Sequence, residues 1–206
     1  GNKKVIDFLI EGGLDGILVL GSAGEFPDLN EQERLDFFRF YAEYVNGRVE
    51  LLAGTGCIRY ADTLALSNAV YELGYTPMVI SPYYFEMDQE KLFVYYDRLA
   101  KDVKGDLYLY NFPPRTGHSI APETIRRLID ANPNIIGLKD SVSTPGHTNM
   151  VCRAVDGKPF TVYSGFDDQF LSNIANNGGG GCIGALSIIV PEIWSSLVKA
   201  ANERDF

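Results

Sequence analysis

Short runs of apolar residues alternate with longer stretches in which apolar residues recur at helical spacing. The apolar runs end at glycine, proline or a polar residue, as expected of buried strands. Asn30 with Glu33 fits a capping box, and Asp88 can cap a later helix. The expected strands are residues 17–20, 51–54, 78–81, 107–110, 135–141, 160–163 and 182–186. The pattern therefore predicts successive strand–helix units and a parallel sheet.

Seven strands separated by helices fit either a doubly wound sheet or an eight-stranded barrel. Two features favour the barrel: no GxGxxG motif follows the first strand, and reactive residues follow the carboxyl ends of several strands. The glycines at 178–181 precede an expected strand instead of opening a helix, so we expect no phosphate-binding loop there. Because the sequence begins with a helix, we expect the missing strand to lie before Gly1.

Composition narrows the classes of partner. The 206 residues are 46% hydrophobic and 22% charged, which suits one domain with a sizeable core. The net charge of -9, without clusters of Lys or Arg, argues against nucleic acid or an anionic membrane as a partner. The three cysteines have neither CxxC nor metal-site spacing, so we expect a reduced, cytoplasmic protein.

The fifth expected strand places a lysine among residues that should be buried. Side chains alternate along a strand, so Lys139 should share a face with Ile135 and Gly137. Ile136 and Leu138 should lie on the opposite face. Desolvation disfavours an ammonium ion, and a neutral amine can attack a carbonyl carbon to form a Schiff base. The alternative is a lysine at a strand end whose head reaches water.

A barrel would bring the carboxyl ends of its strands to one mouth, where partners of a reactive lysine could meet. Tyr110 ends the preceding strand and could carry protons, and Ser22 could orient its phenol. Backbone N–H groups at residues 22–24 and the guanidinium of Arg115 could bind carboxylates. Taken singly, each of these residues also fits an ordinary structural role as a core tyrosine, a turn residue or a solvated charge.

The two histidines, His118 and His147, fall in polar stretches that we expect to be loops. Neither has a carboxylate or a cysteine at the spacing of a metal site, so we assign no metal to them. The sequence also contains no HExxH, GxSxG or Walker motif. Lys139 is therefore the main candidate for chemistry.

Three stretches, residues 21–25, 110–117 and 137–140, read GSAGE, YNFPPRTG and GLKD. Two more, residues 82–84 and 164–168, read PYY and SGFDD. In this order and at this spacing they resemble the signature sequences of the dihydrodipicolinate synthase and N-acetylneuraminate lyase family. The resemblance extends over essentially the whole chain.

The resemblance implies an α/β fold, a (β/α)8 TIM barrel, with residues 1–206 forming a single domain. It implies a pyruvate imine on Lys139 without any other cofactor, with Tyr110 as proton relay and Ser22 hydrogen-bonded to it. Tyr84 matches a tyrosine that family members lend to a neighbouring subunit. The family's first strand and its C-terminal helices have no counterpart in these residues, so we expect an incomplete barrel with unpaired edges.

The resemblance also implies how substrates are bound. Gly165 and Ile183 match positions that line the pyruvate pocket, and Ala23 belongs to the turn that binds the pyruvate carboxylate. Arg115 matches the arginine that binds the carboxylate of aspartate semialdehyde in the synthase branch. Ala23 stands where the synthase usually has a second hydroxyl residue, and this variation resembles branches that act on 2-keto-3-deoxy sugar acids.

We therefore predict a class I aldolase or lyase that condenses pyruvate with aspartate semialdehyde, as dihydrodipicolinate synthase does in lysine biosynthesis. One alternative is a 2-keto-3-deoxy sugar-acid aldolase or an enzyme like N-acetylneuraminate lyase. Another, from a different class, is a non-catalytic sensor of keto acids. The expected assembly is a homotetramer built from dimers, with small-molecule substrates as the other partners.

Overall fold

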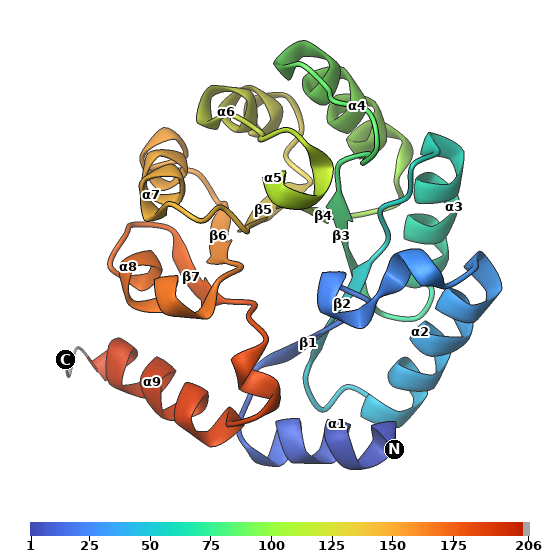
Figure 1. Cartoon of the computed structure of the whole chain (residues 1–206), viewed down its shortest axis with the longest axis vertical. Helices are drawn as coiled ribbons and strands as arrows, with labels where there is room; N and C mark the ends of the chain where they lie inside the picture. Colours follow the sequence, from blue (N-terminus) through green and yellow to red (C-terminus); the bar gives the residue numbers. More distant parts are fainter. Residues whose placement is uncertain (204–206) are drawn as a thin grey trace.

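The computed structural model describes residues 1–203, in which a curled parallel sheet is surrounded by helices (Figure 1). The strands pair in the order of the sequence, from β1 to β7. They are β1 (Gly16–Val19), β2 (Glu50–Gly54), β3 (Thr76–Ile80), β4 (Leu107–Asn111), β5 (Ile135–Asp140), β6 (Thr161–Ser164) and β7 (Gly179–Cys182). Within the described residues β1 and β7 are the two edges, so the sheet is a half barrel.

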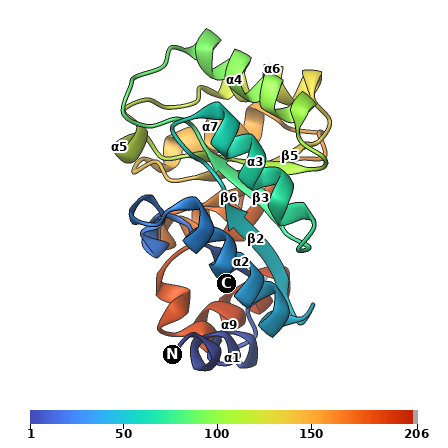
Figure 2. The ribbon, with the colours of Figure 1, turned by 90° about the vertical axis from the view of Figure 1, so that its right-hand side faces the viewer.

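Helices cover the outer face of this sheet. They are α1 (Asn2–Glu11), α2 (Glu31–Val45), α3 (Tyr60–Tyr71), α4 (Gln89–Asp102), α5 (Pro113–Thr116), α6 (Pro122–Ala131), α7 (Pro145–Ala154), α8 (Phe170–Ile174) and α9 (Pro191–Glu203). In Figure 2, α5 and the turns that follow β1 project on the same side of the molecule. This side is the end at which the strands finish. None of the helices in residues 1–203 has the length and apolar character needed to cross a membrane.

Two predicted helix starts are confirmed by the hydrogen bonds of their caps. Asn30 Oδ1 accepts from the Glu33 N–H at 3.0 Å, and the Glu33 carboxylate accepts from the Asn30 N–H at 2.8 Å. Asp88 Oδ1 likewise accepts from the N–H of Lys91 at 2.8 Å. A cap of this kind is worth about 1 kcal/mol, which helps to fix where α2 and α4 begin.

The main apolar core lies between the middle strands and the helices outside them. Leu109 of β4 and Leu138 of β5 are fully buried there in one cluster with Leu99 of α4 and Ile125 of α6. Burying one such side chain contributes roughly 1.5–3 kcal/mol relative to leaving it in water. The opposite face of β4 turns Tyr108 and Tyr110 towards the interior of the curl, where they belong to a second cluster.

The predicted position of the last strand is wrong. The structure places β7 at Gly179–Cys182, so the glycines that we expected to precede a strand form it. A Cβ atom on Gly179 would lie 1.9 Å from the Asn173 carbonyl oxygen, and one on Gly180 would lie 2.2 Å from Thr161 Cγ2. Neighbouring atoms fill the space that side chains would take. The apolar residues expected in the strand fall instead near the 3-10 turn Leu186–Ile188.

The predicted alternation along β5 is wrong at its first residue. The ladder with β4 steps from Leu107–Ile135 directly to Tyr108–Gly137, so that Ile136 is passed over. This bulge puts Ile135 in the outer core with Leu138, whereas Ile136 packs with the inner tyrosines. The side chains of Lys139 and Leu138 still lie on different faces of the sheet, as expected.

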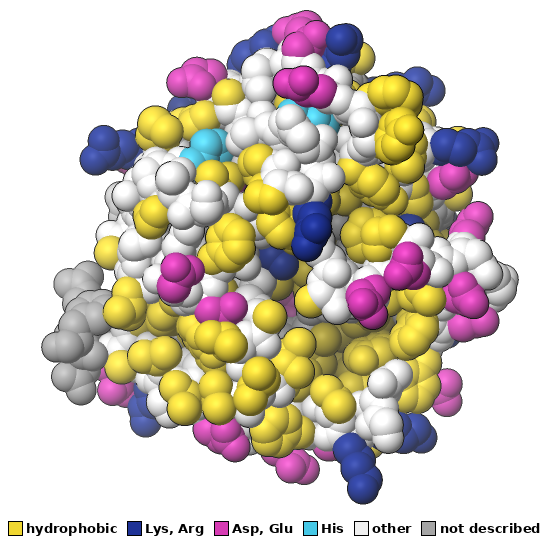
Figure 3. All heavy atoms as spheres, in the orientation of Figure 1, with side chains coloured by type: hydrophobic (Ala, Val, Ile, Leu, Met, Phe, Trp, Pro, Cys, Tyr) yellow, Lys and Arg dark blue, Asp and Glu magenta, His cyan; other side chains and the backbone are white. Residues whose placement is uncertain are grey.

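Exposed apolar side chains gather beside the β7 edge. Figure 3 shows hydrophobic groups over α9 and the segment that leads into it. The exposed residues there are Leu186, Ile188, Ile189 and Ile193, of which Ile189 is the most exposed at 68%. This edge therefore differs from the middle of the sheet, where the apolar side chains are covered.

Candidate active site

Lys139 and Tyr110 lie side by side on the inner face of the half barrel. The two residues are direct partners in the β4–β5 ladder, and the Lys139 Nζ atom lies 4.7 Å from the centre of the Tyr110 ring. Both are buried, with exposed fractions of 8% for Lys139 and 4% for Tyr110. Ser22, in the turn after β1, places its Oγ atom 3.2 Å from the Tyr110 hydroxyl. The structure thus brings these three predicted residues together.

The turn that carries Ser22 has a constrained backbone. Leu20 and Glu25 have φ angles of 56° and 53°, in the left-handed region that side chains other than glycine rarely adopt. Each such residue costs about 1–3 kcal/mol and persists only where the surroundings fix it. Gly54 of β2 permits the close packing, because a Cβ atom there would lie 2.0 Å from the Leu20 carbonyl oxygen. The position of Ser22 is therefore set by packing against β2.

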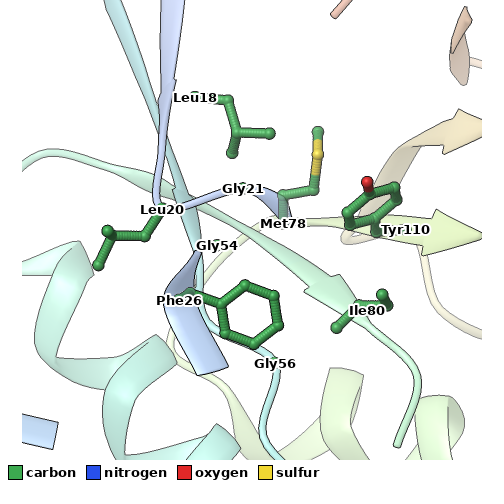
Figure 4. A pocket seen from close by; sticks show the side chains of 9 residues that line it. All are labelled: Leu18, Leu20, Gly21, Phe26, Gly54, Gly56, Met78, Ile80 and Tyr110. Atoms are coloured by element: carbon green, nitrogen blue, oxygen red, sulfur yellow. The ribbon is translucent and has the colours of Figure 1, made fainter. Parts of the chain in front are cut away.

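A small apolar pocket lies beside this turn, and Figure 4 shows the Tyr110 ring on one of its walls. Its lining residues are Leu18, Leu20, Gly21, Phe26, Gly54, Gly56, Met78, Ile80 and Tyr110. Lys139 is not among them, and Tyr110 alone contributes a polar side chain. The pocket thus borders the phenol but not the Lys139 amine.

The backbone of the turn after β1 has two N–H groups left for a ligand. The Gly24 N–H donates to the Gly21 carbonyl at 2.9 Å, and the Glu25 N–H donates to the Ser22 carbonyl at 3.2 Å. Ser22 and Ala23 begin this 3-10 turn, so their N–H groups have no backbone carbonyl within the turn to donate to. Of the donors expected at residues 22–24, Ser22 and Ala23 therefore remain available for a carboxylate, and Gly24 does not.

Arg115 lies in α5 at the rim of the mouth, and its side chain is exposed. Its guanidinium carbon is 5.9 Å from the centre of the Phe112 ring. Phe112 in turn stacks on Tyr110, with ring centres 5.8 Å apart, and meets the edge of Phe166 at 6.2 Å. Aromatic rings therefore lie between Arg115 and the phenol of Tyr110. The exposed guanidinium of Arg115 can meet an anion from solvent.

Gly165 and Ile183 follow the ends of β6 and β7. A Cβ atom on Gly165 would lie 1.8 Å from the Ser141 Oγ atom, so a larger residue does not fit beside the end of β5. The Ile183 N–H donates to the Ser164 carbonyl at 2.9 Å, and the Ile183 side chain packs against the inner cluster that contains Tyr110. Both residues thus lie at the carboxyl ends of the strands, the end at which Lys139 and Tyr110 also lie.

Tyr84 does not join this group within the chain. It lies in the loop after β3 with 82% of its surface exposed, and its φ angle is 101°. Its ring contacts only the neighbouring ring of Phe85 among aromatic partners, at 4.9 Å in the described residues, and Phe85 is itself 73% exposed. Backbone strain in an exposed aromatic loop is typical of a segment that serves a contact or a function.

Sequence reasoning missed a buried polar cluster behind the lysine. Asp140 is fully buried, and its carboxylate lies 2.9 Å from His147 Nδ1 and accepts from Thr148 Oγ1 at 2.7 Å. The prediction that His147 lies in a loop is therefore wrong, since it lies in α7, from which its ring pairs with Asp140. The signal that could have found the cluster is Asp140 itself, because a carboxylate in a buried strand needs partners.

The second histidine, His118, holds the loop that carries Tyr84. Its Nδ1 atom accepts from the Met87 N–H at 3.2 Å, so in the neutral ring Nε2 carries the proton and faces Ser81 Oγ at 2.8 Å. Desolvation by burial lowers the pKa of His118, which favours that neutral form. Across residues 1–203, no group of three or more His, Cys, Asp or Glu side chains is arranged to hold a metal ion.

Comparison with known proteins adds three findings to this geometry. The family model described as "Dihydrodipicolinate synthetase family" matches residues 1–206. The chain is 36% identical to the putative 2-dehydro-3-deoxy-D-gluconate aldolase YagE of Escherichia coli K12, over 100% of this chain and 68% of that protein. It is 35% identical to the 4-hydroxy-tetrahydrodipicolinate synthase of Kosmotoga olearia, over 98% of this chain and 69% of that protein.

The fold is also similar to solved structures. The crystal structure of E. coli YagE in complex with pyruvate superposes with a TM-score of 0.94 at 35% sequence identity. The match covers 98% of this chain and 69% of that one. The curled parallel sheet and its helices are therefore shared with that protein along almost the whole length described above.

Proposed function

This chain belongs to the dihydrodipicolinate synthetase family, whose members include enzymes named synthase and aldolase, and from this premise we propose that it captures pyruvate as an imine on Lys139. The observation that carries the proposal is the convergence of Lys139, Tyr110 and Ser22 at one buried place. An amine beside a phenol whose hydroxyl is held by a serine meets the needs of Schiff-base chemistry.

The proposed reaction begins when the amine of Lys139 attacks the keto carbon of pyruvate. Tyr110 passes a proton to the hydroxyl of the resulting carbinolamine, water leaves, and an iminium forms. Tyr110, which has given up its proton, then takes one from the methyl group to give an enamine. The enamine carbon attacks the carbonyl carbon of an aldehyde, and the aldehyde oxygen takes that proton from Tyr110. Hydrolysis of the new iminium releases the product and restores the lysine.

We place the substrates by the donors that surround the amine. The N–H groups of Ser22 and Ala23 are available at the first turn after β1 and would bind the pyruvate carboxylate. Gly165 and Ile183 would border the bound pyruvate. The exposed guanidinium of Arg115 would bind a carboxylate of the second substrate.

The proposed assembly is a homotetramer built from dimers, in the cytoplasm and without a further cofactor. Tyr84 would complete the proton relay of a neighbouring subunit. Its exposure, its strained backbone and the anchoring of its loop by His118 support a role outside its own chain.

We also propose that the half barrel is part of a (β/α)8 TIM barrel and that residues 1–206 belong to one domain of this kind. The sequential order of seven parallel strands and the two open edges at β1 and β7 support this, because one more strand could pair with both edges. The last three residues of the range, 204–206, lie outside the described residues.

Two aldehyde partners remain as candidates, and different residues favour each. Arg115 favours an aldehyde with its own carboxylate, aspartate semialdehyde, and hence the synthesis of 4-hydroxy-tetrahydrodipicolinate. Ala23, which offers no hydroxyl, favours cleavage of a 2-keto-3-deoxy sugar acid, as does the relative named 2-dehydro-3-deoxy-D-gluconate aldolase. Assaying condensation of pyruvate with aspartate semialdehyde beside cleavage of 2-keto-3-deoxygluconate decides between them.

Exchange of the methyl protons of pyruvate in deuterium oxide tests the proposed chemistry before any aldehyde is chosen. The enamine makes these protons exchangeable, so the protein should deuterate the methyl group and the Lys139→Ala variant should not. Binding of pyruvate without exchange would instead identify a sensor of keto acids and would reject the enzyme.

A further inference from the structure

Side-chain hydrogen bonds link the two residues that follow Tyr110 and Lys139 in the sequence. Asn111 and Asp140 are partners in the β4–β5 ladder, and Asn111 Nδ2 donates to Asp140 Oδ1 at 2.8 Å. Both residues are buried, with exposed fractions of 1% and 0%. The backbone on either side of the amine and the phenol is therefore cross-linked one residue away from each.

The other carboxylate oxygen of Asp140 is held by α7. Asp140 Oδ2 lies 2.7 Å from Thr148 Oγ1 and 2.9 Å from His147 Nδ1. His147 Nε2 lies 3.1 Å from the Ile120 carbonyl oxygen. The Ser119 hydroxyl also faces Nε2, at 3.4 Å, but the nearer Ile120 carbonyl can only accept. The shorter bonds at both ring nitrogens therefore form together when each nitrogen carries a proton.

The charges around His147 also favour the protonated ring. Burial alone lowers the pKa of His147, but the hydrogen bond and charge of Asp140, the Ile120 carbonyl and the Glu123 carboxylate outweigh it and raise the pKa. Burial, and to a lesser extent the charge of Asp140, raise the pKa of the Cys152 thiol in α7 to about 11, so this thiol is neutral. These groups therefore favour an imidazolium at His147 beside Asp140.

We propose that His147 is a positioning residue that acts through Asp140 to fix Lys139 beside Tyr110. This inference rests on the proposed function, in which Lys139 captures pyruvate. The geometry extends to β6, because the Gly165 N–H donates to the Asp140 carbonyl at 2.8 Å. Movement of Asp140 would thus displace the lysine, the end of β4 through Asn111, and Gly165 at the pyruvate pocket.

The expected consequence is kinetic. A displacement of about 1 Å at reacting groups can slow a reaction by roughly 10²-fold. The backbone N–H groups of Ser22 and Ala23 and the side chain of Arg115 lie outside the cluster, so binding of the carboxylates should change little. Loss of the His147 contact should therefore slow imine formation more than it weakens the affinity for pyruvate.

The experiment compares the wild-type protein with the variants His147→Ala and His147→Asn. Asn places an N–H donor close to the position of Nδ1 but cannot titrate, whereas Ala leaves the Asp140 carboxylate without that partner. The measured quantity is the rate constant of imine formation with pyruvate, obtained by rapid quenching with borohydride between pH 6 and pH 9. Met150→Ala, on the exposed face of α7, is the control and should behave like the wild type.

We expect His147→Ala to slow imine formation by about 10- to 100-fold with little change in the affinity for pyruvate. His147→Asn should recover most of the rate near neutral pH. The ratio of the wild-type rate to the His147→Asn rate should fall as the pH rises and His147 loses its proton. Melting curves establish that each variant is folded.

Two results would overturn the inference while leaving the proposed function intact. One is a folded His147→Ala variant that captures pyruvate at the wild-type rate. The other is a His147→Asn variant that is as slow as His147→Ala and whose ratio to the wild type does not depend on pH. Absence of any pyruvate adduct in the wild-type protein would instead reject the proposed function, and this inference with it.

Discussion

The middle of the sheet and its β7 edge are held in different ways. All residues of β4 are buried, and Asn111 bonds to Asp140 of β5 through their side chains. β7 consists largely of glycine, pairs only with β6 in the described residues, and borders exposed apolar side chains. Lys139, which we propose forms the imine, lies in the middle of the sheet, where both packing and side-chain hydrogen bonds fix its position.

The difference between the two regions has a chemical meaning. The proposed reaction needs a fixed separation between Lys139 and Tyr110, and in the middle of the sheet packing and hydrogen bonds act on both sides of them. Ile183, at the β7 end, contributes a backbone contact and an apolar side chain, which tolerate small displacements. We therefore expect substitutions in the middle to be costly for both stability and rate, and matched substitutions at the edge to be mild.

The largest effect on rate should come from Tyr110→Phe. This change removes the phenol hydroxyl and keeps the ring that stacks on Phe112 and lies under the Lys139 amine. We expect turnover to fall by about 10²- to 10⁴-fold, since the proton relay is lost. Steady-state kinetics measure the loss, and a melting curve verifies the fold. Activity within a few fold of the wild type would remove Tyr110 from the mechanism.

The largest effect on stability should come from Asp140→Ala. The substitution removes the carboxylate that pairs with the His147 ring and also leaves Asn111 and Thr148 without that partner, at a cost of about 3–5 kcal/mol. Asn177→Ala, which removes an exposed hydrogen bond to Asp156 near β7, should change stability by less than about 0.5 kcal/mol. Urea unfolding compares the two variants, and equal losses would show that the middle of the sheet is held no more firmly than its β7 edge.

A pair of glycine substitutions sharpens the comparison at smaller energies. A Cβ atom on Gly137 of β5 would meet the Tyr108 ring at 2.4 Å and the Thr161 carbonyl oxygen at 2.6 Å, so backbone must move. On Gly180 of β7 the three nearest atoms would all be side-chain atoms, of Thr161 and Tyr163. Overpacking costs about 1–3 kcal/mol, and we expect Gly137→Ala near the upper end and Gly180→Ala near the lower.

Urea unfolding of each variant and of the wild type measures the loss in free energy of unfolding that each substitution causes. The comparison would fail if Gly180→Ala were as destabilising as Gly137→Ala, because the edge would then be packed as rigidly as the middle.

The smallest effect should be a dependence of stability on pH. The pKa of His147 is raised in the folded protein, so its contribution is complete below its ordinary value of about 6.5 and is lost as the pH rises through the folded pKa. Between pH 6 and pH 9 the free energy of unfolding should therefore fall more for the wild type than for His147→Asn. Parallel curves for the two proteins would show that the histidine does not titrate in this way.

The middle of the sheet could be predicted from the sequence because its strands are buried on both faces. Apolar runs at 107–110 and 135–141 correspond closely to β4 and β5, and the rule that strand ends meet at one mouth brought Lys139, Tyr110 and Ser22 together correctly. The bulge at Ile136 could not be foreseen, since it depends on the register with β4.

The edge and the polar cluster could not be predicted for a different reason. Gly179 is required by the Asn173 carbonyl, and side chains of Thr161 and Tyr163 lie beside Gly180; only the folded chain brings those residues there. The pairing of Asp140 with His147 crosses from a strand to the next helix, a contact that no helical or strand periodicity describes.

Borohydride reduction in the presence of pyruvate, followed by peptide mapping of the trapped protein, is the decisive test of imine formation on Lys139. We expect a stable pyruvate adduct on Lys139 alone, and no adduct at all in the Lys139→Ala variant. An adduct on another lysine, or none on the folded wild-type protein, would reject Lys139 as the residue that captures pyruvate.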